Sequence, residues 1–146
     1  HPSNSSDPLT MMHPGAAANQ YLRTQVKSSQ PLELVVLMYD AALRFTATAR
    51  EAMVKGDIPT RRTAISKTMA IINELQSSLD MQQGGPIAEE LDRLYTWIST
   101  CLLDAVSKKD HRPIDDARKV IETLRNAWQT IATAGPNTPA SPGTRP

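Results

Sequence analysis

Residues 30–53, QPLELVVLMYDAALRFTATAREAM, carry the strongest helical signal in the chain. Pro31 suits a first helical turn, where its missing N–H is not needed, and Glu33 places a carboxylate near the positive end of the helix dipole. Apolar residues then recur at steps of three, four or seven, as expected of a helix with one face in a core: Leu34, Met38, Ala41, Phe45 and Ala52. The stretch is therefore predicted to be a long amphipathic helix.

Residues 34–38, LVVLM, add a complication to this helix because they are five consecutive apolar side chains. At about 100° per residue, such a run points in every direction around the helix axis. In a small bundle at least one of the five must face outward unless something covers it. The cover could be another part of this chain or another protein.

Composition narrows the class of protein. A chain of 146 residues is long enough for one domain with a core. Sixteen basic and fifteen acidic residues, without a basic run, and only six aromatic residues argue against nucleic-acid binding. No apolar run approaches the roughly 20 residues of a transmembrane helix, and no signal peptide is visible. A soluble protein of the cytoplasm, without membrane insertion, is expected.

The two ends of the chain differ in composition from its middle. Residues 1–19 predict a disordered leader, whose first ten residues, HPSNSSDPLT, are read as vector-derived or as a native tail. Residues 134–146 are rich in proline and predict a flexible tail. The folded domain is placed at residues 20–133.

Four internal prolines divide this domain at nearly even intervals: Pro31, Pro59, Pro86 and Pro113. Each precedes a helical pattern of apolar residues, and proline is favoured at a helix start and disruptive inside one. Short connections force consecutive helices to run antiparallel. The sequence therefore predicts an all-α protein, an antiparallel up-down four-helix bundle with a short N-terminal capping segment.

The connections between these helices carry their own signals. Gly56 is predicted to end the first helix, and Asp57 to cap the second. Gly84 and Gly85 are predicted to end the second helix. The sequence around Lys109 repeats the first connection without its glycine.

No catalytic or metal-binding pattern is found. A di-iron bundle needs a Glu-x-x-His pair on two helices, and the chain has none. His111 lies in a predicted turn and is expected to be solvated, and no histidine lies in mid-helix for phosphotransfer. Cys101, the only cysteine, falls on the apolar stripe of the third helix and is interpreted as a buried, inert thiol. We expect no enzyme activity, no cofactor and no metal.

Three stretches resemble the FliS-type flagellar secretion chaperones. Tyr21 and Val26, followed by PLELVVLMYDAAL at 31–43, are similar to the family's tyrosine, its "SPxEL" and its "LYDGA" run. LDMQQGGPIAEELDRLYTWISTCLLDA at 79–105 resembles its "GGxIAxxLxxLYxY" segment, and LRNAW at 124–128 also fits. The resemblance covers residues 20–133, although Gln30 stands where the family often has a serine and Pro86 where it often has a polar residue.

The resemblance implies an antiparallel bundle that is not an enzyme. Its partner would be the C-terminal segment of flagellin, disordered until export, which the chaperone keeps from polymerising prematurely. It would then deliver flagellin to a component of the flagellar type III export gate. In the family, the N-terminal segment can cover the client site when flagellin is absent.

Site residues follow from combining this implication with the surplus apolar surface of the first helix. The predicted flagellin-binding groove consists of Leu34, Leu37, Met38, Tyr39, Ile71, Leu75, Leu91 and Leu94. The predicted removable cover consists of Tyr21, Leu22 and Val26. The alternative is a regulatory adaptor that sequesters another helical partner, such as a transcription or sigma factor, and the sequence leaves a homodimer open.

Overall fold

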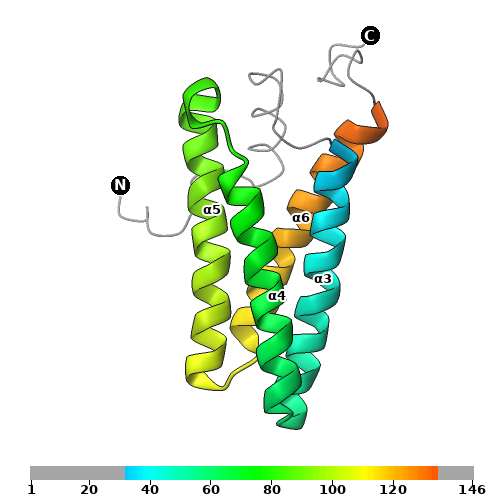
Figure 1. Ribbon diagram of the computed structural model, residues 1–146, viewed down its shortest axis with the longest axis vertical. Coiled ribbons are helices and arrows are strands. Elements are labelled where there is room, and N and C mark those ends of the chain that lie inside the picture. Colours follow the sequence, from blue (N-terminus) through cyan, green and yellow to red (C-terminus); the bar gives the residue numbers. More distant parts are fainter. Residues whose placement is uncertain (1–31, 135–146) are drawn as a thin grey trace.

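The computed structural model describes residues 32–134, which form four helices and no strand. These are α3 (Leu32–Lys55), α4 (Ile58–Ser77), α5 (Met81–Lys108) and α6 (Arg112–Ala134), labelled as in Figure 1. The predicted all-α four-helix bundle is confirmed. The predicted leader and capping segment lie outside the described residues, as does the predicted tail except for Ala134, which is the last residue of α6.

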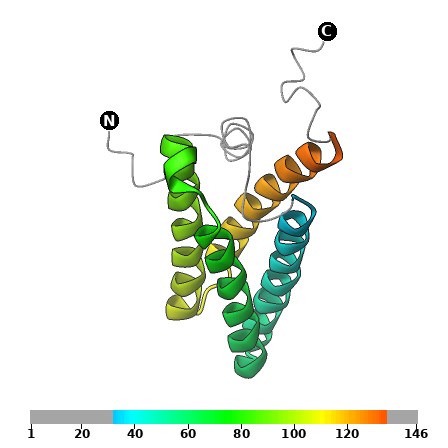
Figure 2. The ribbon, with the colours of Figure 1, turned by 45° about the horizontal axis from the view of Figure 1, so that its top comes forward.

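The four helices form a ring in which each packs against its two neighbours in sequence order, and α6 closes the ring against α3. Consecutive helices run in opposite directions, as the colour order in Figures 1 and 2 shows. Because the order around the ring is α3, α4, α5 and α6, helices α3 and α5 lie on one diagonal of the bundle. The packing of α3 against α4 is the most extensive of the four interfaces.

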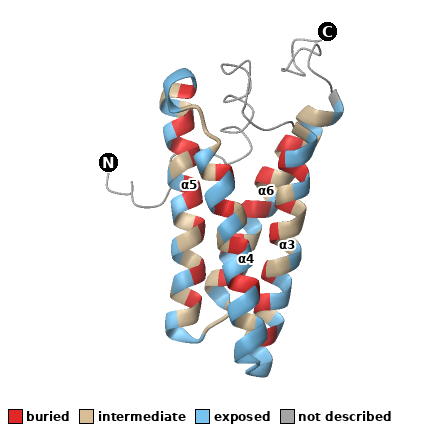
Figure 3. Ribbon diagram, in the orientation of Figure 1, coloured by how far each residue is buried: buried red, intermediate tan, exposed pale blue. Residues whose placement is uncertain are grey.

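The inward faces of the helices make one continuous core. Figure 3 shows the buried residues along the inner side of each helix and the exposed ones on the outside. The largest fully buried side chains are Tyr39, Tyr95, Ile72, Leu91, Leu94, Ile98, Leu102, Ile114, Ile121 and Leu124. Burial of this apolar surface is the main source of stability, at about 25 cal/mol per Å² removed from water.

Two of the three connections use the same backbone turn. After α3, the Asp57 N–H donates to Ala52 O at 2.8 Å and the Gly56 N–H to Met53 O at 3.2 Å, with Gly56 at φ 76°. This is a Schellman motif, which satisfies the last carbonyls of a helix. The predicted roles of Gly56 and Asp57 are confirmed, because the Asp57 carboxylate also accepts the Thr60 N–H that opens α4.

The connection after α5 repeats the motif with lysine in place of glycine. The Asp110 N–H donates to Ala105 O at 3.0 Å and the Lys109 N–H to Val106 O at 3.3 Å. Lys109 adopts φ 55°, the only positive φ of a non-glycine residue in the described chain. An L-residue pays a steric penalty in this left-handed region.

The connection between α4 and α5 differs from the prediction. Gly84 and Gly85 do not end α4, which stops at Ser77. Instead the Asp80 carboxylate accepts the Gln83 N–H at 2.9 Å and starts an additional helical turn. Gly85, at φ 53° and ψ −134°, breaks the helix, and Pro86 then begins the long part of α5 as predicted. The prediction was wrong because it treated the glycines as a terminator and overlooked Asp80 as a cap.

Polar contacts join α3 to α6 along the side of the core. Arg125 Nε donates to Asp40 Oδ1 at 2.7 Å, and Arg118 Nε donates to Thr46 Oγ1 at 3.1 Å. The residue numbers rise on α3 as they fall on α6, so these bonds fix the antiparallel register of the two helices.

The same seam ends in a three-residue cluster. Arg50 Nε lies 2.6 Å from Asp115 Oδ1, and His111 Nδ1 lies 2.8 Å from Asp115 Oδ2. His111 was expected to be solvated, and this contact corrects that expectation. Burial raises the pKa of Asp115, but the hydrogen bonds from Arg50 and His111 lower it by more, so its pKa lies below the usual value.

The strain at Lys109 leads to a prediction. Lys109→Gly should raise the free energy of unfolding by about 1 kcal/mol, because glycine adopts positive φ without the steric penalty. Urea unfolding measures the change. Ser107→Gly, at an exposed position inside the last turn of α5, is the control and should lower stability by about 0.5–1 kcal/mol. If both substitutions raised the free energy of unfolding, or both lowered it, the steric strain assigned to Lys109 would be contradicted.

The Asp115 cluster predicts a pH dependence. Because the folded pKa is depressed, the contribution of Asp115 to stability is present above its unfolded value of about 4 and is lost as the pH falls through the lower folded value. The difference in Tm between the wild type and Asp115→Asn should therefore be at its full size above about pH 5 and shrink as the pH falls below about 4. Asp116→Asn, at the exposed neighbouring position, should show little difference throughout.

Candidate functional site

The face that α3 turns to the core is not the predicted one. Its buried residues are Val35, Val36, Tyr39, Ala42, Thr46, Ala49 and Ala52. Of the predicted stripe, only Ala52 is buried, while Leu34 is exposed and Met38, Ala41 and Phe45 are half-buried. The stripe therefore lies at the outer edge of α3. Thr46 belongs to the core because its hydroxyl donates to Ala42 O at 2.8 Å, which satisfies it inside the bundle.

The outer edge of α3 exposes large apolar side chains. Leu37 is 62% exposed and Leu34 is 42% exposed, whereas Met38 packs partly against the core. The expectation that the apolar run at residues 34–38 must turn at least one side chain outward is thus met by two leucines. We call Leu34, Leu37, Met38 and Phe45 the outer edge of α3.

A groove lies between α3 and α4 near the connection that joins them. Its volume is about 370 Å³, and it is lined by Phe45, Thr48, Pro59, Thr60, Thr63, Ala64 and Lys67. Lys67 Nζ lies 5.3 Å from the centre of the Phe45 ring. We call this the Phe45 groove. It was not predicted, although the position of Phe45 on the surplus stripe and of Pro59 at the start of α4 are the signals that could have found it.

The predicted groove residues fall into two groups. Leu34 and Leu37 are exposed, and Met38 and Ile71 are half-buried at the edge of the core. The other four are buried in the core: Tyr39, Leu75, Leu91 and Leu94. The described structure therefore does not bring the eight together on one surface. The predicted cover, Tyr21, Leu22 and Val26, lies outside the described residues.

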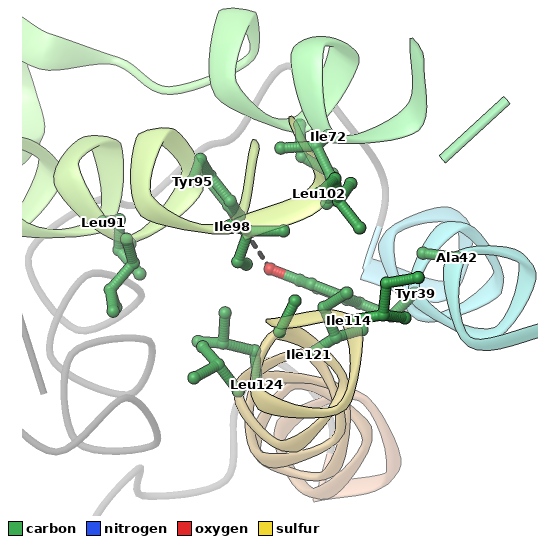
Figure 4. Close-up of a cluster of buried hydrophobic side chains, with 14 of the residues drawn as sticks. Tyr39, Ala42, Ile72, Leu91, Tyr95, Ile98, Leu102, Ile114, Ile121 and Leu124 are labelled. Atoms are coloured by element: carbon green, nitrogen blue, oxygen red, sulfur yellow. Dashed lines mark hydrogen bonds between the residues drawn. The ribbon is translucent and has the colours of Figure 1, made fainter. Parts of the chain in front are cut away.

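Tyr39 crosses the core to meet Tyr95. Its ring projects from α3 toward α5, and the two hydroxyl oxygens are 2.6 Å apart (Figure 4). Burial raises the pKa of Tyr39 well above its usual value, and the neighbouring Tyr95 raises it too. The Tyr39 hydroxyl therefore stays neutral, and its bond with the Tyr95 hydroxyl connects the diagonal helices α3 and α5. Hydropathy could not reveal this pairing.

The described residues offer little for metal or redox chemistry. Between residues 32 and 134, no group of three or more His, Cys, Asp or Glu side chains is arranged to hold a metal ion. Cys101 is half-buried rather than fully buried as expected, since Leu102 takes the core position. No described helix combines the length and the hydropathy of a membrane span.

The Tyr39–Tyr95 bond can be tested with a double-mutant cycle. Tyr39→Phe and Tyr95→Phe should each lower the free energy of unfolding by about 1–2 kcal/mol, because each leaves a buried hydroxyl without this partner. The double variant should lose less than the sum of the two. Urea unfolding measures all three, and strictly additive losses would show that the bond contributes nothing.

Comparison with known proteins places this bundle among flagellar proteins. The family model described as "Flagellar protein FliS" matches residues 14–135. The flagellar secretion chaperone FliS of Vibrio cholerae is 31% identical over 108 residues, 74% of this chain and 79% of the relative. FliSB of Pseudomonas aeruginosa is 30% identical over 125 residues, 83% of this chain and 99% of the relative.

A third relative agrees with these two. The flagellar secretion chaperone FliS of Campylobacter jejuni is 32% identical over 120 residues, which cover 82% of this chain and 94% of the relative. The resemblance predicted from the sequence is confirmed. Since the family model spans most of the chain and the relatives align over most of their length, the chain belongs to the FliS family of flagellar secretion chaperones.

Proposed function

We propose that this protein binds the disordered C-terminal segment of flagellin in the bacterial cytosol, prevents its premature polymerisation and delivers it to the flagellar type III export gate. The family to which the chain belongs is one of chaperones, not enzymes. The observation that carries the proposal is that Leu34 and Leu37 are exposed on the same helix that lines the Phe45 groove. A chaperone for a helix-forming segment needs such an apolar strip.

Burial of apolar surface supplies the driving force for binding. An amphipathic client segment that folds along the outer edge of α3 would cover Leu34, Leu37 and the half-buried Met38. Ordering a disordered segment costs about 2–5 kcal/mol, which offsets part of this gain. The offset favours release at the export apparatus, because the complex holds the client without excessive affinity.

Four of the predicted groove residues lie in the core and are not accessible to a client in this structure: Tyr39, Leu75, Leu91 and Leu94. They would meet a client only if the helices moved apart. We therefore propose the outer edge of α3 as the first contact. The segment with Tyr21, Leu22 and Val26 would compete for the same edge when no client is present, because it is apolar and only a short chain separates it from α3.

Calorimetric titration tests this proposal. About forty C-terminal residues of flagellin from the same organism should bind one-to-one with a strongly negative heat-capacity change. Leu37→Asp should weaken this binding by about tenfold or more, because a carboxylate would have to lose water beneath the client. The fold should survive, since Leu37 is 62% exposed.

Leu103→Asp is the matched control for this titration. Leu103 is 56% exposed but lies on α5, so its replacement should leave the affinity unchanged. Equal weakening by both variants would show that apolar surface in general, not the edge of α3, binds the client. No binding by the wild type would refute flagellin as the partner.

A further inference from the structure

The Phe45 groove combines apolar walls with one cationic side chain, Lys67. The first half of α4, residues 58–69, contains Arg61, Arg62 and Lys67 and no carboxylate. Of these three, Lys67 lines the groove. The groove therefore favours a ligand that carries a negative charge as well as apolar surface.

Lys67 is available for such a ligand. In the described part of the chain, none of the ion pairs includes Lys67. Its ammonium group lies 5.3 Å from the centre of the Phe45 ring. A lysine stem packs along apolar surface while its charged end stays near water. The groove thus has an aromatic wall beside a cation that no carboxylate neutralises.

The remaining walls suit a carboxylate as well. Thr48, Thr60 and Thr63 line the groove. The Thr60 side chain bonds to the Asp57 carboxylate, which leaves the hydroxyls of Thr48 and Thr63 to donate to a ligand. A carboxylate has two oxygens and needs several donors once it leaves water. Lys67 and the hydroxyl of Thr48 or Thr63 can meet that need, while Phe45, Pro59 and Ala64 offer apolar surface for a side chain.

The outer edge of α3 leads directly into this groove. Leu34, Met38, Ala41 and Phe45 follow one another at steps of four, three and four, which keeps them on one side of the helix. At 1.5 Å per residue, Leu34 and Phe45 are about 16 Å apart along the helix axis. A helical client segment of about three turns would therefore reach from the exposed leucines to the groove.

From this arrangement we infer that the Phe45 groove accepts one apolar side chain of the client and that Lys67 pairs with a carboxylate next to it. The inference rests on the proposed function and deepens it, because it names a feature that the client must have. The acidic residue lies about eleven positions along the client helix from the side chain that covers Leu34. Apolar contact along α3 then supplies affinity, and the charge at the groove selects and aligns the segment.

Variants at Lys67 test the inference in the complete chain. The probe is again a peptide of about forty C-terminal residues of flagellin, titrated at low and high salt. Lys67→Glu should weaken binding about tenfold or more, because it sets a carboxylate against the client's own. Lys67→Met, which keeps the stem and removes the charge, should weaken it less and should reduce its salt dependence.

Arg62→Glu provides the control, and Thr63→Trp and a peptide without carboxylates are two further tests of the groove. Arg62→Glu reverses a charge on the same helix at an exposed position that does not line the groove, so affinity should change less than about threefold. Thr63→Trp fills the groove without altering charge and should weaken binding as strongly as Lys67→Glu. A peptide with every Asp and Glu replaced by Asn and Gln should bind wild type and Lys67→Met equally. Circular dichroism confirms that each variant is folded.

The outcomes separate the inference from the proposed function. Tight binding that Lys67→Glu leaves unchanged, or that Arg62→Glu weakens equally, would overturn the inference and leave flagellin binding intact. Absence of binding by the wild type would overturn both. If Lys67→Glu and Thr63→Trp both weaken binding and Arg62→Glu does not, the groove is supported as the site that pairs with the client's carboxylate.

Discussion

A helix in a four-helix ring packs against two neighbours, and it can bury little more than half of its circumference. This limit governs α3, which carries more apolar residues than half a circumference can hold. Val35, Val36 and Tyr39 take the inner positions. Leu34 and Leu37 are left outside as a geometric consequence, and no rearrangement of α3 alone could bury all five residues of the run.

The two flanks of α3 are built differently. Toward α6, Asp40 and Arg50 are engaged in ion pairs, so that flank is closed by directional bonds. Toward α4, the flank is formed by Met38 and Phe45, which make no such bonds. Charge pairs fix the register of α3 against α6, whereas on the side of α4 Phe45 lines a groove.

Much of this fold could be predicted from local sequence signals. Gly56, Asp57, Pro59 and Pro113 mark helix ends through backbone requirements that involve only neighbouring residues. The extra helical turn after Asp80 was not predicted, because Gly84 and Gly85 are a strong signal for a helix end and Asp80 is a weaker signal for a helix start. The rotation of α3 was misread because periodicity cannot distinguish two overlapping apolar stripes. The buried stripe includes Thr46, whose hydroxyl is satisfied in the core by donating to Ala42 O and accepting from Arg118 Nε.

The site was less predictable than the fold because it depends on residues distant in the sequence. Tyr39 was predicted to line the groove, whereas in the structure it is buried and its hydroxyl meets that of Tyr95 on the diagonal helix. The Phe45 groove needs α4 beside α3 at a defined register, and its charge comes from Lys67 on the second helix. The run of five apolar residues predicted that at least one side chain would face outward, but it did not indicate which of the five would be enclosed.

The short connection between α3 and α4 has a consequence for the order of folding. Two residues separate these helices, and their interface is the most extensive in the bundle. Contacts between residues close in sequence form early, because little chain entropy is lost in closing the loop. The α3–α6 interface must wait until the last helix leaves the ribosome. The hairpin that bears the groove can thus assemble during synthesis, while closure of the ring is a late, long-range step.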